Sequence, residues 1–187
     1  MMIYMIYYGY DNYFNYAMRH VSIMSNKLIF HYGTVNSSKT MSLLSMAFNY
    51  EQVGWNVCTI KPAVDTRSDM IETRAKVPPR KVDIVIKDTI NQADVIFVDE
   101  CQFLTESQID ELRAISIDRN IDILCFGLRT DYTAHLFPAS KRLFELADEI
   151  TEIKTICNIC GKKAAFNVKV CEQDCQIVPG WDTFQQR

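Results

Sequence analysis

The sequence predicts an α/β fold in which a parallel sheet is covered by helices on both faces. First, short apolar segments alternate with amphipathic segments of helical period between residues 27 and 150, as in strands joined by crossover helices. Second, the strand candidates 95–99 and 121–126 are apolar almost throughout, which is typical of parallel strands buried on both faces. Third, a chain of 187 residues with 48% apolar residues is long and apolar enough for one domain with a sizeable core.

The strand candidates share short apolar runs that are bounded by polar or turn residues. They are residues 27–32, 55–60, 82–86, 95–99 and 121–126. In an open parallel sheet, ligands bind at the edge where the carboxyl ends of the strands meet. Residues 62–81 hold three Pro and many charged residues, so we expect a loop there.

Three helices are expected between these strands. Residues 39–52 and 137–150 have helical periodicity, and a third helix follows Thr105 and Gln108, whose spacing fits a capping box. The residues expected on the inward helix faces are Leu44, Ala47 and Phe48; Ile109, Leu112 and Ile115; and Leu143, Phe144, Leu146 and Ala147.

The chain divides into three regions. Residues 1–23 are rich in Met and Tyr and show neither helical nor strand periodicity. We interpret them as a disordered extension, or as sequence upstream of a true start at Met24, in preference to an amphipathic anchor. Residues 24–150 hold the alternating elements of the main domain. From residue 151, short β-like pieces surround two Cys pairs, so residues 151–187 are expected to form a small second unit.

Composition excludes several classes of protein. A net charge of −3 argues against a general nucleic-acid binder. No apolar run approaches the ~20 residues that span a bilayer, and the first residues lack the basic start of a signal peptide. The seven cysteines are odd in number, which argues against a disulfide framework. We therefore expect a reduced, cytoplasmic protein with neither a membrane nor a nucleic-acid partner.

The segment GTVNSSKT, from Gly33 to Thr40, follows the first strand and begins the first helix. It fits the phosphate-loop pattern G-x-x-x-x-G-K-[ST] except at Ser38, where the pattern has Gly. In such a loop, backbone N–H groups at a helix N-terminus surround the phosphates. Lys39 stands where the pattern neutralises β/γ charge, and Thr40 stands where a hydroxyl holds Mg²⁺. If Ser38 takes a positive φ, the strain costs about 1 kcal/mol.

An acid ends the strand candidate 95–99. Asp99 closes the strand, and Glu100 follows it directly. In a phosphate-loop enzyme, such an Asp holds the metal ion. An adjacent Glu can deprotonate a substrate hydroxyl or orient a water. The alternative is that Asp99 and Glu100 are only solvated acids at a strand end. The phosphate loop makes this interpretation the weaker one.

Two Cys pairs lie in the second unit. Cys157 and Cys160 form a C-x-x-C pair followed by Gly, a common zinc-binding shape, but a structural zinc needs four ligands. Cys171 and Cys175 are spaced acceptably for a second pair, although Cys171 lies in an alternating strand candidate. Cysteines without a metal are therefore the alternative interpretation.

Five segments carry a further signal: KLIFHYGTVNSSKT, KPAVDTR, VIFVDECQF, FGLRTDYTAHLFPASKRLFELADEI and ITEIKTICNICGKKA. In this order they resemble the thymidine kinases of the compact, zinc-containing type, most closely the bacterial and bacteriophage members. The resemblance runs from about Lys27 to the end of the chain. It implies a P-loop NTPase-like kinase domain over 24–150 and a lasso and zinc-binding subdomain over 151–187.

The resemblance implies transfer of the ATP γ-phosphoryl group to the 5′-hydroxyl of thymidine, with Mg²⁺, in nucleotide salvage. Deoxyuridine is an alternative substrate. In the catalytic step, Glu100 would be the general base and Arg67 would stabilise the transferring group, while Thr40 and Asp99 would hold Mg²⁺. The implied ATP-binding residues are Gly33, Thr34, Val35, Asn36, Ser37, Ser38, Lys39, Thr40, Asp99, Glu100, Cys101 and Gln102. The implied nucleoside-binding residues are Asp65, Phe103, Tyr132, Phe137 and Phe184.

In this family, a lasso loop closes over the nucleoside and is anchored by Zn²⁺ between two Cys-containing pairs. Here residues 176–184 would form the lasso, and Cys157 and Cys160 would be the first zinc pair. The chain ends just before the family's second C-x-x-[CH] pair is expected. The resemblance therefore describes a C-terminally truncated member with an incomplete zinc site. It also implies a homotetramer.

Two alternatives stay open. One is an inactive remnant of the family, because Ser38 replaces Gly and the second zinc pair is absent. The other is a different phosphate-loop ATPase in which Glu100 activates water. Phe103, Tyr132 and the lasso segment favour the kinase, because a plain ATPase has no use for them.

Overall fold

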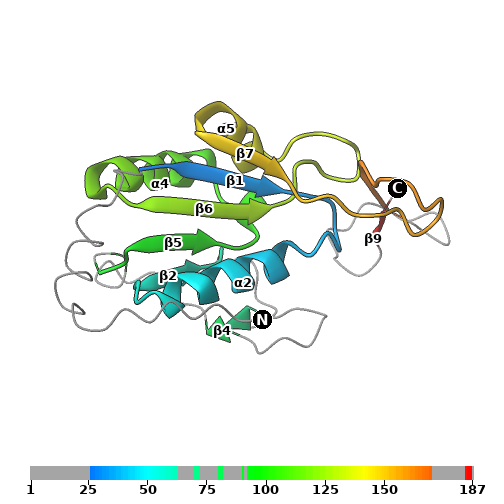
Figure 1. Cartoon of the computed structure of the whole chain (residues 1–187). Helices are drawn as coiled ribbons and strands as arrows, with labels where there is room; N and C mark the ends of the chain where they lie inside the picture. The colour runs from blue at the N-terminus through cyan, green and yellow to red at the C-terminus, as the bar shows by residue number, and fades with distance from the viewer. Residues whose placement is uncertain are drawn as a thin grey trace, which may run out of the picture.

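A five-stranded sheet, in which every neighbouring pair is parallel, lies at the centre of the protein (Figure 1). The computed structural model describes residues 26–62, 70–71, 80–81, 90, 92–169 and 184–186. The strand order is β2-β5-β6-β1-β7. In that order, the strands are Val57–Ile60, Val95–Val98, Asp122–Gly127, Leu28–Tyr32 and Glu149–Glu152.

Helices cover both faces of this sheet (Figure 1). Helix α2 (Lys39–Gln52) packs on one face, and α4 (Glu106–Arg119) and α5 (Pro138–Leu146) pack on the other. Alternate side chains of β5 point to opposite faces, so both faces are apolar. The core on the α2 side includes Leu43, Leu44, Ala47, Val95, Phe97, Leu124 and Phe126. The core on the other side includes Leu28, Phe30, Ile96, Val98, Ile109, Leu112, Ile123 and Leu143. The predicted α/β fold class is confirmed.

The predicted capping box begins α4. The Thr105 hydroxyl accepts from Gln108 N–H at 3.2 Å, and the Gln108 side-chain oxygen accepts from Thr105 N–H at 2.9 Å. Two N–H groups that a helix start leaves without partners are thereby satisfied. The inward face is also confirmed, since Ile109 and Leu112 are buried and Ile115 packs against the same core.

The predicted inward face of α2 is wrong at one position. Phe48 is 57% exposed, whereas Leu43 is fully buried. The buried residues of α2 are Lys39, Leu43, Leu44 and Ala47, so the buried face of the helix ends before Phe48. The sequence shows that Phe48 is apolar, but it does not show where the contact of the helix with the sheet ends.

The last predicted helix is too long. Helix α5 ends at Leu146, and Glu149–Glu152 form β7, the edge strand beside β1. Ala147 already has extended backbone, with φ −70° and ψ 136°. Asp148 exchanges hydrogen bonds with Leu28, because its carboxylate and its N–H engage Leu28 N–H and C=O, both at 2.8 Å. The pairing of this segment with the free edge of β1 therefore overrides its helical periodicity.

The region between β2 and β5 is only partly described. Within the predicted loop 62–81, two short strands, β3 (Met70–Ile71) and β4 (Arg80–Lys81), form an antiparallel pair, so the prediction of a plain loop is wrong there. The predicted strand 82–86 and the extension 1–23 lie outside the described residues.

The predicted second unit contains another antiparallel pair, β8 (Asn167–Lys169) with β9 (Phe184–Gln186).

A short 3₁₀ turn, η1 (Cys101–Phe103), follows β5 in the main domain. None of the helices in the described part of the chain is long and apolar enough to cross a membrane.

Candidate active site

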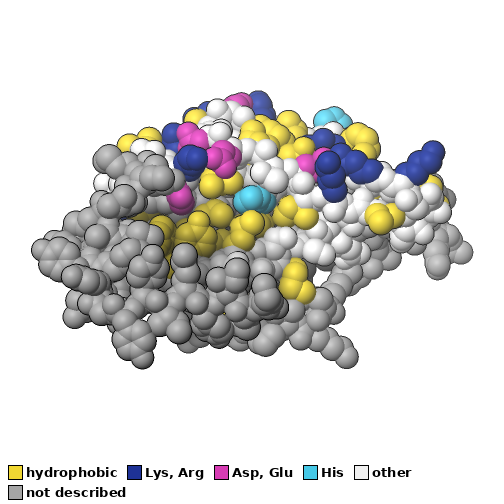
Figure 2. Space-filling model, viewed as in Figure 1, with side chains coloured by type: hydrophobic (Ala, Val, Ile, Leu, Met, Phe, Trp, Pro, Cys, Tyr) yellow, Lys and Arg dark blue, Asp and Glu magenta, His cyan; other side chains and the backbone are white. Residues whose placement is uncertain are grey.

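The carboxyl ends of β1, β5 and β6 carry the segments in which the sequence predicts the site. The phosphate loop follows β1, Asp99 and Glu100 follow β5, and loop 128–137 follows β6 (Figure 1). Gly33 N–H donates to Gly127 C=O at 3.2 Å, which ties the phosphate loop to the end of β6. Figure 2 shows Lys and Arg side chains toward the end of the molecule where these strands terminate and also elsewhere on this face.

The phosphate loop has the backbone conformation that its pattern predicts. Ser38 precedes α2 with φ 63° and ψ 27°, in the left-handed region that favours Gly. The expected strain at Ser38 is therefore present, and its side chain makes no capping hydrogen bond. Gly33 is required for space, because a Cβ there would lie 2.7 Å from Ile153 O. The loop closes on itself where Ser37 N–H donates to Thr34 C=O at 3.2 Å.

Lys39 lies folded into this loop. Its ammonium donates to Thr34 C=O at 2.7 Å and to Ser37 Oγ at 3.4 Å. Burial lowers the pKa of Lys39, while the negative charges of Glu100 and Asp99 oppose that shift. The cation is thus held at the loop, near two carboxylates, where a bound phosphate would meet it.

The two residues predicted to hold Mg²⁺, Thr40 and Asp99, lie in contact with each other. Thr40 Oγ1 donates to Asp99 Oδ2 at 3.4 Å, and Asp99 Oδ1 accepts from Glu100 N–H at 3.0 Å. Burial raises the pKa of Asp99 to about 7, and the charge of Glu100 adds to the shift. Carboxylate and hydroxyl oxygens are ligands that Mg²⁺ prefers, so the donor set fits that ion. A divalent cation beside Asp99 would offset the cost of its buried charge.

Glu100 lies at the turn between β5 and η1. Its backbone is left-handed, with φ 50° and ψ 38°. Gln102 Nε2 donates to Glu100 Oε2 at 2.6 Å. Glu100 thus directly follows Asp99, and its charge acts on Lys39.

Two of the four aromatic residues predicted to bind the nucleoside are in contact. The rings of Phe103 and Phe137 meet edge to face, with centroids 6.0 Å apart and an interplanar angle of 73°. Tyr132 lies half-buried in the turn that the Thr130–Leu136 bridge closes. Two segments, one after β5 and one after β6, thus bring aromatic side chains to the same edge of the sheet as the phosphate loop.

The remaining predicted residues are described only in part. Asp65, Arg67, Cys171 and Cys175 lie outside the described residues. Phe184 begins β9 and pairs with Lys169 of β8, which places the end of the predicted lasso beside that strand.

The C-x-x-C pair forms a tight turn. Ile159 N–H donates to Cys157 Sγ at 3.4 Å, and Gly161 N–H donates to Cys157 C=O at 2.9 Å. Cys157 is buried and Cys160 is exposed. Within the described ranges, no group of three or more His, Cys, Asp or Glu residues could hold a metal ion. The two sulfurs alone are half of a tetrahedral zinc site.

Sequence reasoning missed Asn167 and Arg129. Asn167 is 5% exposed; its Oδ1 accepts from Val35 N–H of the phosphate loop at 2.8 Å, and its Nδ2 donates to Thr130 C=O at 3.4 Å. Arg129 donates to Ala165 C=O at 3.1 Å. Both residues tie the second unit to the site. The available signal for Asn167 was a polar residue between apolar neighbours in FNVKV.

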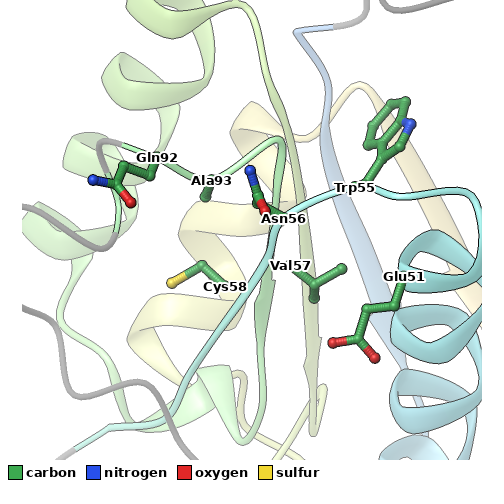
Figure 3. Close-up of a pocket in the computed structure, with 7 residues that line it drawn as sticks. All are labelled: Glu51, Trp55, Asn56, Val57, Cys58, Gln92 and Ala93. Atoms are coloured by element: carbon green, nitrogen blue, oxygen red, sulfur yellow. The ribbon is translucent and has the colours of Figure 1, made fainter. Parts of the chain in front are cut away.

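A pocket of about 420 Å³ lies at the opposite, amino end of the sheet (Figure 3). Trp55, Val57 and Cys58 line it from the start of β2, and Gln92 and Ala93 line it from the segment before β5. Its described lining contains none of the predicted site residues, so it is separate from the edge described above.

Comparison with known proteins gives consistent matches. A family model for thymidine kinase matches residues 26–186. The thymidine kinase of Enterobacteria phage T4 is 35% identical over 165 residues, which cover 82% of this chain and 85% of the phage protein. The thymidine kinase of Chromobacterium violaceum is 40% identical over 152 residues, covering 77% and 82%. Among solved structures, AMPPCP-bound DnaA from Aquifex aeolicus has 19% identity and a TM-score of 0.48, with 81% of this chain and 48% of that chain covered.

Proposed function

The chain belongs to the thymidine kinase family, and from that premise we propose that the carboxyl edge of its sheet transfers the ATP γ-phosphoryl group to the 5′-hydroxyl of thymidine. The observation that carries this proposal is the convergence of three parts at one edge. These are the phosphate loop with Lys39, the Asp99–Glu100 pair and the Phe103–Phe137 contact. An enzyme that only hydrolyses ATP needs the first two parts but not the third.

The phosphate loop and Lys39 bind the β- and γ-phosphates. The N-terminus of α2 presents N–H groups that have no partner within the helix. Thr40 and Asp99 would hold Mg²⁺, which, when bound, neutralises charge on the phosphate oxygens. Phosphoryl transfer requires positioning and charge neutralisation more than covalent catalysis, and these side chains supply both.

Glu100 acts as the general base. Its carboxylate takes the proton of the 5′-hydroxyl while that oxygen forms a bond to the γ-phosphorus. The bond from the γ-phosphorus to the bridging oxygen breaks, and the products are dTMP and ADP. Phe103, Tyr132 and Phe137 enclose the flat pyrimidine, because an aromatic wall excludes water from a base without requiring charge.

Further residues, most of them outside the described part of the chain, complete the proposal. We assign Arg67 to the transferring phosphoryl group and Asp65 to the nucleoside site. Residues 176–184 serve as the lasso, with Phe184 against the nucleoside. Zinc binding at Cys157 and Cys160 requires further ligands, for which Cys171 and Cys175 are the candidates of this chain. We also propose that the protein is cytoplasmic and that it forms a homotetramer.

The test measures the transfer of labelled phosphate from ATP to thymidine in the presence of Mg²⁺. It is carried out on the full chain of 187 residues and on a shorter chain that starts at Met24. We expect labelled dTMP and ADP in equal amounts. ADP without dTMP, at a rate indifferent to thymidine, would establish the ATPase alternative. Neither product from a folded chain would establish the inactive remnant. Deoxyuridine as a competing substrate measures base preference.

The matched variant is Glu100→Gln, which keeps the shape of the side chain and removes the base. We expect turnover to fall by about 10²- to 10⁴-fold, while ATP binding survives because the phosphate loop is intact. Unchanged turnover would remove Glu100 from the role of base.

A further inference from the structure

Gln102 is a buried amide whose two ends are both engaged. It is 2% exposed. Its Nε2 donates to Glu100 Oε2 at 2.6 Å, and its Oε1 accepts from Leu128 N–H at 3.0 Å. Rotating the amide by 180° would set its oxygen against the carboxylate and its NH₂ against a backbone N–H, so only one orientation satisfies both partners.

The space around this amide is closed by the end of β6. A Cβ added at Gly127 would lie 2.6 Å from Gln102 Oε1, 2.6 Å from Cys101 Sγ and 3.2 Å from Gln102 N. Real Cβ atoms essentially never approach other atoms within 3.0 Å. The 3₁₀ turn η1 and β6 therefore approach each other so closely that only Gly fits at position 127.

The contact with Gln102 restrains the Glu100 side chain. The left-handed backbone of Glu100 turns the chain away from the strand, and its N–H is occupied by Asp99 Oδ1. A Glu side chain has three rotatable bonds, and the nearby Asp99 carries the same charge when ionised. The charge of Lys39 and the Gln102 amide both oppose this repulsion, and the amide, as a hydrogen-bond donor, also favours one rotamer of the Glu100 side chain.

We infer that Gln102 is a positioning residue that fixes the Glu100 carboxylate against the backbone of Leu128, so that the base meets the nucleoside hydroxyl in line with the phosphate loop. This inference rests on the proposed role of Glu100 as base. Leu128 begins the loop that carries Tyr132 and Phe137, so the same amide aligns the base with the element that holds the nucleoside.

Two variants separate the two ends of the amide. Gln102→Glu keeps an oxygen for Leu128 N–H but removes the donor to Glu100, and Gln102→Leu removes both. We expect kcat to fall about 10- to 100-fold in each, since a displacement of about 1 Å in a catalytic group costs that much. The KM for thymidine should stay within about twofold in Gln102→Glu, because this variant keeps the contact with Leu128 and alters none of the aromatic residues. Gln92→Leu, an exposed position before β5, is the matched control and should leave kcat unchanged.

A double-mutant cycle with Glu100→Gln completes the test. If Gln102 acts through Glu100, Gln102→Leu has no further effect on kcat in the Glu100→Gln background. Equal loss in both backgrounds would overturn the inference while leaving the proposed function intact. If the wild-type chain makes no dTMP, the proposed function fails instead. In that case, the same double-mutant cycle is measured on the free energy of unfolding. Additive effects of the two substitutions there would show that Gln102 and Glu100 do not interact, which would also overturn the inference.

Discussion

Ser38→Gly tests whether the departure from the phosphate-loop pattern is a strain that the fold tolerates. Ser38 has φ 63° and ψ 27°, and a non-Gly residue in this region costs about 1–2 kcal/mol. Its side chain is exposed and makes no capping hydrogen bond, so no such contact offsets the strain. Gly itself costs about 0.5–1 kcal/mol through the entropy of the unfolded chain. The net expectation is a stabilisation of about 0.5–1 kcal/mol.

Scanning calorimetry without nucleotide measures this effect. For a chain of this size, about 1 kcal/mol shifts Tm by roughly 2–4 °C, so Ser38→Gly should raise Tm by about 1–4 °C. Ser38→Ala is the control, because it removes the hydroxyl and keeps the strain, and its Tm should not rise. Equal Tm values for the two variants, or a lower Tm for Ser38→Gly, would refute the argument from backbone strain.

The remaining predictions concern three buried groups. Burial raises the pKa of Asp99 to about 7 from 3.8, so the folded state holds a proton that the unfolded state has released. Metal-free stability should therefore fall by up to about 4 kcal/mol as pH rises from about 4 to about 7, and Asp99→Asn should flatten that part of the denaturant-unfolding profile. Burial lowers the pKa of His31, against the opposing charge of Glu149, so the unfolded state binds the proton first and stability should fall as pH drops below about 6.5. His31→Phe, which keeps a ring against Phe126, should lose that fall, and an unchanged acid slope would contradict it. Asn167→Ala should raise KM for ATP by about three- to tenfold, because the phosphate loop loses its hydrogen bond at Val35 and each lost hydrogen bond costs about 1 kcal/mol. Steady-state kinetics measures this KM, and an unaltered value would show that the loop holds its shape without Asn167.

Local signals predicted a large part of the fold. The bounds of α2, the capping box of α4 and the strands β1, β5 and β6 follow from periodicity and from short-range hydrogen bonds. Such features depend on residues within about four positions of one another, and the sequence displays them directly. Asp99 and Glu100 were predictable for a related reason, because the end of a parallel strand always lies at the ligand-binding edge.

The misplaced elements have a common cause. Phe48 and Glu149–Glu152 were assigned by local pattern, but their environment is determined by a neighbour distant in sequence. For Glu149–Glu152, that neighbour is β1, whose free edge accepts a fifth strand. For Phe48, that neighbour is the sheet, against which α2 packs Leu43, Leu44 and Ala47 while Phe48 stays exposed.

By itself, the sequence predicted the groups of the proposed site, namely the phosphate loop, Asp99, Glu100 and the aromatic side chains, at successive strand ends. Only the tertiary structure decided how those groups are held. The contact of Gln102 with Leu128 spans 26 positions, and that of Asn167 with Val35 spans 132. No periodicity encodes a hydrogen bond between side chain and backbone across such separations, because it forms only after the sheet has brought both segments to one edge.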